Sequence, residues 1–180
     1  MNGAHSVGVP EIGELILVSA CLIGLPARYN GQVVFHEHPL LRRWLGEGRL
    51  LPFCPEVAGG LPTPRLPAEV ADGKGGQGVL EGAGRVIDRS GADVTEPFVA
   101  GARQAQLLVR ERKIRMAILK EGSPSCGSTY SYDGTFSSVR LPLPGVTTAA
   151  LEAVGVRVFS ENQLDAAARH LAQLTSRSGG

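Results

Sequence analysis

Short apolar runs recur along the chain, and longer stretches with helical spacing separate them. The runs lie at residues 14–20, 50–53, 114–120 and 156–159, and Gly, Pro or Ser residues follow each of them closely. Runs this short, bounded by turn-forming residues, are typical of strands that are buried on both faces. They predict the strands of a sheet that lies inside the molecule.

Amphipathic segments alternate with these runs. Residues 94–112 carry apolar side chains three or four positions apart, and Thr95 is placed to cap the N-terminus of the predicted helix. Further helices are predicted at residues 38–46 and 147–154 and after Ser160 and Gln163, which have capping-box spacing. Because strands and helices alternate, the pattern predicts the α/β class: a Rossmann-like three-layer domain with a mostly parallel sheet and helices on both faces.

The segment from residue 55 to residue 84 departs from this alternation. It contains eight glycines and four prolines. Long irregular segments inside compact domains are usually functional or mobile, so we interpret this one as a loop on the substrate side. A plain flexible surface loop fits the composition equally well. A short strand is expected directly after it, at residues 85–88.

The length of 180 residues favours one domain over two. We assign residues 14–175 to this single domain and expect flexible tails at residues 1–13 and 176–180. Hydrophobic residues make up 43% of the chain and charged residues 19%. These proportions are those of a folded globular protein and not of a disordered one.

The charge of the chain and its targeting signals limit which binding partners and which cellular location we expect. The 18 basic and 17 acidic residues nearly cancel and form no long block of one sign, so a polymeric nucleic acid is not a favoured partner. The N-terminal segment lacks the features of a signal peptide, and no segment approaches the roughly 20 apolar residues that span a membrane. Three cysteines, an odd number, suit a reducing compartment. We therefore expect a cytoplasmic protein with no membrane partner; its oligomeric state stays open.

The three cysteines occupy equivalent places in the predicted fold. Cys21, Cys54 and Cys126 each lie at the end of a predicted strand or a few residues beyond it, next to Gly, Pro or Ser. The carboxyl ends of parallel strands share one edge of a sheet, and ligands bind at that edge. A lone cysteine is most often a small buried apolar residue, but three cysteines at strand ends predict one shared site.

Three thiolates fit more than one kind of site. They could hold zinc with His36 or His38 as a fourth ligand, or a 4Fe-4S cluster with one iron left open. An open iron would accept a soft exogenous ligand such as a thiocarbonyl sulfur. The alternatives are a zinc or iron-sulfur protein without catalysis and an enzyme that uses one cysteine as its nucleophile.

The segments around the cysteines closely resemble the thiouracil desulfidase family. The matching segments run in order over residues 15–161 and cover most of the chain. They comprise VSACLIG at residues 18–24, RYNG at 28–31, CPEVAGGL at 54–61, PR at 64–65, DVT at 93–95, LK at 119–120 and SPSCG at 123–127. The sequence departs from the family in LPA at residues 25–27, where relatives often have a shorter or cysteine-containing turn, and in PLP at residues 142–144.

This resemblance implies that Cys21, Cys54 and Cys126 bind three irons of a 4Fe-4S cluster and that the fourth iron takes the sulfur of 2-thiouracil or a related thiouracil or thiouridine compound. Water would replace the sulfur on the ring without a redox change, and sulfide would be released. The protein is thus expected to be an iron-sulfur-dependent desulfidase. Some relatives that act on thiolated transfer RNA carry an extra domain for which this chain has no room. Together with the near-neutral charge, this favours a free base, nucleoside or nucleotide over RNA as the expected substrate.

Two polar residues beside the cysteines are candidates for catalysis. Glu56 follows Cys54 by two positions and could act as a general base or proton donor, although a solvated loop carboxylate would look the same in the sequence. Ser123 precedes Cys126 by three positions. It could orient or polarise water or attack the thiocarbonyl carbon itself, but serines also fill turns of this kind routinely.

The remaining candidates are expected to bind the substrate. Arg28, Arg65 and Lys120 could hold a carbonyl oxygen, a phosphate or the negative charge of the cluster. Tyr29 could stack on a base, although ordinary packing is an equally simple role for it. Ser125, beside the third cysteine, completes the set and could instead hydrogen bond to cluster sulfides or to the backbone.

Overall fold

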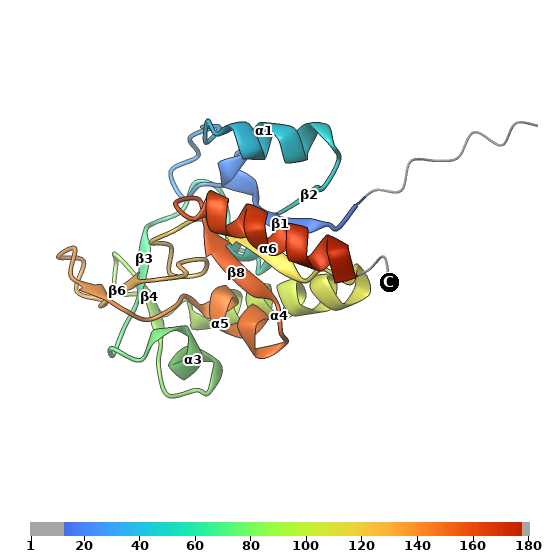
Figure 1. The fold of residues 1–180 in the computed structure, drawn as a ribbon. Helices are drawn as coiled ribbons and strands as arrows, with labels where there is room; N and C mark the ends of the chain where they lie inside the picture. Colours follow the sequence, from blue (N-terminus) through green and yellow to red (C-terminus); the bar gives the residue numbers. More distant parts are fainter. Residues whose placement is uncertain (1–12, 178–180) are drawn as a thin grey trace, which may run out of the picture.

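A four-stranded parallel sheet forms the centre of the computed structural model, which describes residues 13–177 (Figure 1). Its strands lie in the order β2-β1-β5-β8, and every neighbouring pair is parallel. The strands are β1 (Ile16–Ser19), β2 (Leu50–Phe53), β5 (Met116–Leu119) and β8 (Arg157–Ser160). The four predicted core strands are confirmed: β2 has its predicted bounds, and the ends of the other three are shifted by one or two residues.

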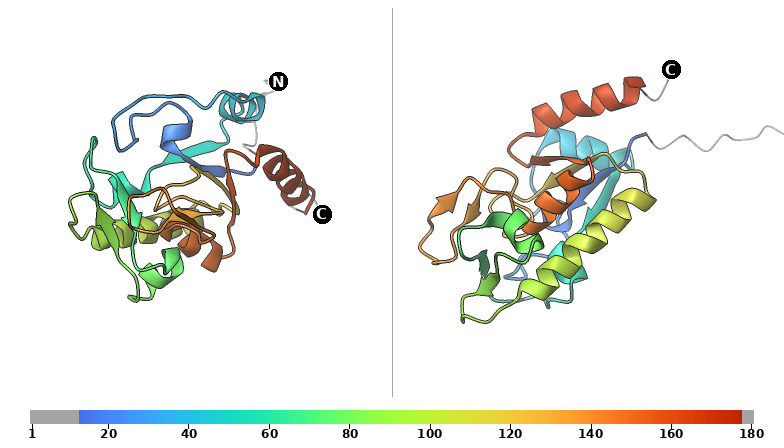
Figure 2. Two further views of the ribbon diagram at one scale, coloured as in Figure 1. Left: turned by 90° about the vertical axis from the view of Figure 1, so that its left-hand side faces the viewer. Right: turned by 90° about the horizontal axis from the view of Figure 1, so that it is seen from below.

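Helices cover both faces of this sheet (Figures 1 and 2). One face packs against α1 (Pro39–Gly46) and α6 (Leu164–Arg177), and the other against α4 (Thr95–Glu111) and α5 (Val146–Ala153). Successive side chains of a strand point to opposite faces. Accordingly, Ile16 and Val18 lie in one core with Trp44 of α1, whereas Leu17 lies in the other with Val109 of α4. The predicted three-layer α/β fold is confirmed.

The N-terminus of α4 differs from the prediction in one detail. Thr95 does not cap the helix, because its Oγ1 accepts a hydrogen bond from the backbone N–H of Val86 at 2.9 Å. Instead, Asp93 Oδ1 accepts a hydrogen bond at 2.9 Å from the backbone N–H of Thr95, the first residue of the helix. The Thr95 hydroxyl thus fastens the helix to the strand before it.

The glycine-rich segment is more regular than predicted. It contains α2 (Pro55–Ala58), β3 (Ala68–Val70) and α3 (Gly75–Leu80), and β3 pairs antiparallel with β4 (Val86–Asp88). The strand expected at residues 85–88 therefore exists but belongs to a separate two-stranded sheet. A third apolar core joins this unit to α4 and α5 through residues that include Val70, Val86, Phe98 and Val146.

Two glycines explain why α2 can pack directly on α4. A Cβ at Gly59 would lie 1.9 Å from the Pro97 carbonyl oxygen, and a Cβ at Gly101 would lie 1.9 Å from the Pro55 carbonyl oxygen. Only residues without a side chain permit this approach. It fixes α2, which begins one residue after Cys54.

The fold is completed by the short helix η1 (Ala20–Leu22) after β1 and by a hairpin of β6 (Ser131–Tyr132) and β7 (Arg140–Leu141). No helix within residues 13–177 combines the length and the apolar character that a membrane span needs. The tail predicted at residues 1–13 lies, apart from Gly13, outside the described residues, as do residues 178–180. Residues 176–177 of the other predicted tail belong to α6.

Candidate functional site

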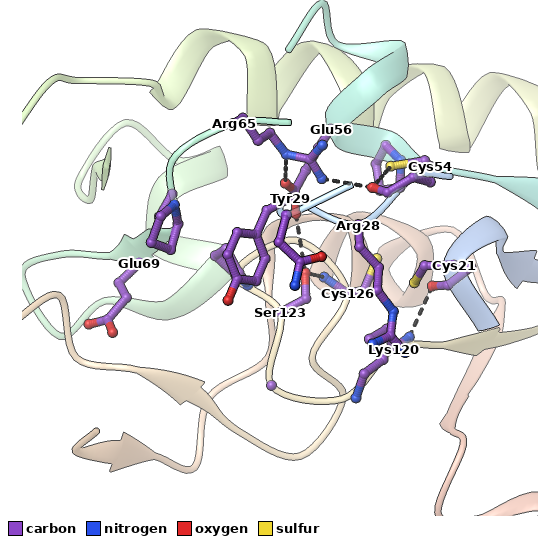
Figure 3. A pocket seen from close by; sticks show the side chains of 18 of the residues that line it. Cys21, Arg28, Tyr29, Cys54, Glu56, Arg65, Glu69, Lys120, Ser123 and Cys126 are labelled. Carbon is purple, nitrogen blue, oxygen red and sulfur yellow. Dashed lines mark hydrogen bonds and ion pairs between the residues drawn. The ribbon is translucent and has the colours of Figure 1, made fainter. Parts of the chain in front are cut away.

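The three cysteines line one pocket at the carboxyl edge of the parallel sheet (Figure 3). Cys21 lies in η1 directly after β1, Cys54 lies between β2 and α2, and Cys126 lies in the loop after β5. The pocket has a volume of about 380 Å³. All three thiols are free. The fold thus brings together three cysteines that are far apart in the sequence.

Burial keeps these thiols protonated in the absence of a bound cation. It raises the pKa of Cys21 to about 11 against the opposing charge of Arg28, and it also raises the pKa of Cys54 and of Cys126. Nucleophilic cysteines have a lowered pKa, so none of the three has the environment of an activated nucleophile. A metal would supply the positive charge that ionises them.

A zinc site that uses a histidine is not supported. His38 Nδ1 accepts a hydrogen bond from the Leu40 N–H at 3.2 Å and caps α1, and neither His38 nor His36 lines the pocket. Among residues 13–177, no three His, Cys, Asp or Glu side chains converge closely enough to hold a single metal ion. A cluster is larger than one ion, and three thiolates spread around a pocket suit it better.

The guanidinium of Arg28 also fits an anionic group in the pocket. Its Nε is buried and has no hydrogen-bond partner in the described part of the chain. Arg28 lines the pocket beside the cysteines, and its charge acts on Cys21. Buried polar atoms are normally satisfied. A cluster held by three thiolates carries the negative charge that would satisfy this one.

Glu56, Ser123 and Arg65 form a hydrogen-bonded chain on the same pocket wall (Figure 3). Arg65 Nε donates to Glu56 Oε2 at 2.6 Å, and Ser123 Oγ donates to Glu56 Oε1 at 3.3 Å. The Arg65 and Glu56 side chains are only 8% and 13% exposed, so solvent screens their ion pair weakly. Arg65 also donates to the Ala27 carbonyl oxygen and thereby ties Glu56 to the segment that carries Arg28.

The hydroxyl of Ser123 is oriented from both sides. The backbone N–H groups of Ser125 and Cys126 both donate to its Oγ at 3.1 Å. Since these donors occupy the oxygen lone pairs, the hydroxyl proton is left for Glu56. Two N–H groups aimed at one oxygen would also stabilise negative charge that develops there.

Lys120 lines the pocket but is already paired. Its Nζ lies in an ion pair with Glu161 and also donates to the Glu121 carbonyl oxygen at 3.2 Å. The second Glu161 oxygen accepts from the Glu121 N–H at 2.7 Å. Glu161 is therefore a structural partner of the site that the sequence did not reveal, because nothing in its local pattern marks it.

Glu121 organises the loop that carries Ser123 and Cys126. Its buried carboxylate accepts hydrogen bonds from both the backbone N–H and the hydroxyl of Ser128 and of Thr129. The Ser128 hydroxyl is therefore engaged by Glu121, at a hydrogen-bond distance of 2.9 Å. Burial raises the pKa of Glu121, but the hydrogen bonds from Thr129 and Ser128 outweigh it and hold the pKa below its ordinary value.

We expect Glu121→Ala to lower the free energy of unfolding by about 3 kcal/mol, because it leaves buried donors unsatisfied. Because the folded-state pKa of Glu121 is depressed, its contribution is fully present above the ordinary carboxyl pKa and is lost as the pH falls through the folded-state value. Urea unfolding of wild type and variant at neutral and acidic pH measures both effects. The exposed Glu111→Ala is the control, and an equal loss in that variant would contradict the role of Glu121.

Two predicted substrate-binding residues are placed differently. Tyr29 lines the pocket but is 49% exposed, so it lies at the mouth. Ser125 is fully buried, and its hydroxyl shares a 2.8 Å hydrogen bond with that of Thr147. Because Ser125 does not line the pocket, substrate contact by its side chain is not supported; it anchors the loop to α5.

The pocket has a wall that sequence reasoning missed. Glu69 of β3, Arg89 after β4, and Tyr132 and Phe136 of the β6–β7 hairpin all line it. These residues come from the small antiparallel sheets, and no local motif connects them. Only the three-dimensional fold sets them opposite the cysteines.

The chain has a family match, a sequence relative and a structural neighbour. A sequence model described as 2-thiouracil desulfurase matches residues 16–163. YbbK of Bacillus subtilis (strain 168) is 44% identical over 151 residues, which are 84% of this chain and 98% of that protein. The solved structure of the 4Fe-4S-dependent thiouracil desulfidase TudS superposes with a TM-score of 0.80 at 48% identity, covering 89% of this chain and 99% of that chain. Because the family match spans most of the chain, this protein belongs to the 2-thiouracil desulfurase family.

Proposed function

We propose that this protein removes sulfur from a thiolated pyrimidine and that it does so with a 4Fe-4S cluster held by Cys21, Cys54 and Cys126. The observation that carries the proposal is the pocket itself, in which three free thiols face the Glu56–Ser123 pair (Figure 3). The family membership of the chain and its similarity to a 4Fe-4S-dependent thiouracil desulfidase support it.

The overall reaction is a hydrolysis without electron transfer. The carbon–sulfur bond of the thiocarbonyl breaks, a carbon–oxygen bond to water forms, and the two protons of water leave with the sulfur as hydrogen sulfide. When bound, the cluster would supply an open iron that takes up the thiocarbonyl sulfur. The protein side chains must then position the oxygen nucleophile and accept its proton.

Glu56 is placed to accept that proton. Arg65 holds one carboxylate oxygen at 2.6 Å, while the other faces the Ser123 hydroxyl at 3.3 Å. In this arrangement Ser123 either orients a water molecule toward the ring carbon or provides the attacking oxygen, in which case water must then break the bond between Ser123 and the ring. In both cases the proton passes to Glu56, and the N–H groups of Ser125 and Cys126 stabilise charge on the Ser123 oxygen.

The substrate in this proposal is a small molecule. The pocket volume of about 380 Å³ lies at the lower end of the range for small-ligand pockets, and the net charge of +1 gives no broad surface attraction for RNA. A free base, nucleoside or nucleotide therefore fits better than a polymer. Three free thiols and an oxygen-sensitive cofactor would require a reducing compartment such as the cytoplasm.

Anaerobic reconstitution with iron and sulfide tests the proposal directly. We expect brown protein that binds about four irons per chain and converts 2-thiouracil or 4-thiouracil to uracil with stoichiometric sulfide release, without an added reductant or oxidant. Sulfide is measured colorimetrically and uracil chromatographically. Protein that binds zinc and no iron, or a fully loaded cluster that releases no sulfide from either base or its nucleoside, would refute it.

A further inference from the structure

The pocket wall opposite the cysteines contains a carboxylate with no place in the reaction above. Glu69 lies in β3 and is 9% exposed. Figure 3 shows it at the far end of the pocket lining from Cys21, with its carboxylate directed away from the cysteines. A buried carboxylate needs hydrogen-bond donors to offset its desolvation, and those donors reveal what it does.

Glu69 fixes the tip of the β6–β7 hairpin. One and the same oxygen, Oε2, accepts from the Gly134 N–H and from the Phe136 N–H, both at 3.0 Å. The hairpin lies beside β3 and β4 (Figures 1 and 2). A Cβ at Gly134 would lie 2.7 Å from the Ala71 Cα, so the hairpin backbone lies directly against the end of β3. These contacts attach the hairpin tip to β3.

The residue held in this way is an aromatic one in an unusual backbone conformation. Phe136 has a φ of +56°, which is uncommon for a bulky residue and costs about 1–3 kcal/mol. Such a conformation persists only where surrounding contacts hold it. Phe136 lines the pocket, and the Arg89 guanidinium lies 5.5 Å from the centroid of its ring. The Phe136 ring is therefore held in place by the backbone hydrogen bond to Glu69 and by the contact with the Arg89 guanidinium.

We propose that Phe136 is a substrate-binding residue that packs against the pyrimidine on the side away from the cysteines, and that Glu69 is the residue that positions it. This inference rests on the proposed function and extends it to a specific contact. A flat aromatic ring offers the surface on which a pyrimidine binds, and stacking of this kind tolerates different ring substituents. The contact would be made equally before and during the reaction, so it should govern binding and not the chemical step.

The steady-state experiment compares single and double variants of cluster-loaded enzyme on 2-thiouracil. Phe136→Ala should raise KM about tenfold with kcat within about twofold of wild type, and Phe136→Leu should keep much of the affinity because it remains apolar. Glu69→Ala should raise KM by a similar factor. The double variant Glu69→Ala/Phe136→Ala should be no worse than Phe136→Ala alone, because Glu69 acts through Phe136. Additive effects, or an unchanged KM in Phe136→Ala, would overturn the proposal.

Hydrogen exchange tests the positioning role without any turnover. Glu69→Ala should accelerate amide exchange in the peptide that contains Gly134 and Phe136, since both N–H groups lose their acceptor. Glu69→Gln should restore slow exchange and a low KM, because a single amide oxygen can accept both bonds. Val139→Ala, on the exposed and pocket-remote part of the hairpin, is the control. Unchanged exchange in Glu69→Ala would overturn the positioning role, whereas failure of the proposed function would show as wild-type protein that releases no sulfide.

Discussion

Replacing Cys126 with alanine should abolish iron binding and sulfide release together. With Cys126 missing, only Cys21 and Cys54 of the three thiols in the pocket would remain, and two thiolates cannot hold three irons of a cubane cluster. Iron content, visible absorbance and sulfide release of the reconstituted variant measure the loss. Cys21→Ala and Cys54→Ala should behave alike, because each thiol would take one iron of the proposed cluster.

The same three variants separate the cluster from a nucleophilic cysteine. Cysteine to alanine removes only a sulfur atom, so the fold should survive, and circular dichroism with thermal unfolding checks this. An enzyme with one nucleophilic thiol would lose activity in one variant and tolerate the other two. The raised pKa values of all three thiols argue against that outcome. Full iron loading of Cys126→Ala would contradict the cluster assignment.

The central sheet and its helices could be predicted because their signals are local. The inner strands β1 and β5 are short apolar runs that are buried on both faces, and the long helix α4 carries its apolar residues at helical spacing. The sequence predicts β4, but β3 and the pairing of these two strands could not be predicted in the same way. Both strands are three residues long, and the β6–β7 hairpin packs against them through close backbone contacts such as that between Gly134 and Ala71. Contacts of that kind leave no periodic pattern in the sequence.

The functional site likewise contains residues that the sequence predicts and residues that it does not. The cysteines, Glu56 and Ser123 stand in or beside short motifs, and the fold places all of them on one pocket. Glu69 and Glu161 escaped prediction because their partners are distant: the Phe136 N–H lies 67 residues from Glu69 along the chain, and the Glu121 N–H lies 40 residues from Glu161. A carboxylate that binds backbone groups at such a separation has no sequence signature. Its role becomes visible only in the folded chain.

Glu56→Gln should keep the cluster and lose turnover. Glutamine has nearly the same shape and retains an oxygen that can accept from Arg65, so the three cysteines should still bind iron and the protein should keep its colour. It cannot take a proton, however, and loss of a general base typically lowers kcat about 10²- to 10⁴-fold. Stopped assays of sulfide release, normalised to iron content, measure the effect.

The Ser123→Ala variant should be measured alongside Glu56→Gln. It removes the hydroxyl that donates to Glu56 at 3.3 Å and that accepts from the Ser125 and Cys126 N–H groups. If Ser123 and Glu56 act as one proton-transfer unit, the double variant should be barely slower than the slower single variant. Glu111→Gln, at the exposed end of α4 and away from the pocket, should leave kcat unchanged. Wild-type kcat in a Glu56→Gln enzyme with a full cluster would show that Glu56 does not accept the proton and that solvent does.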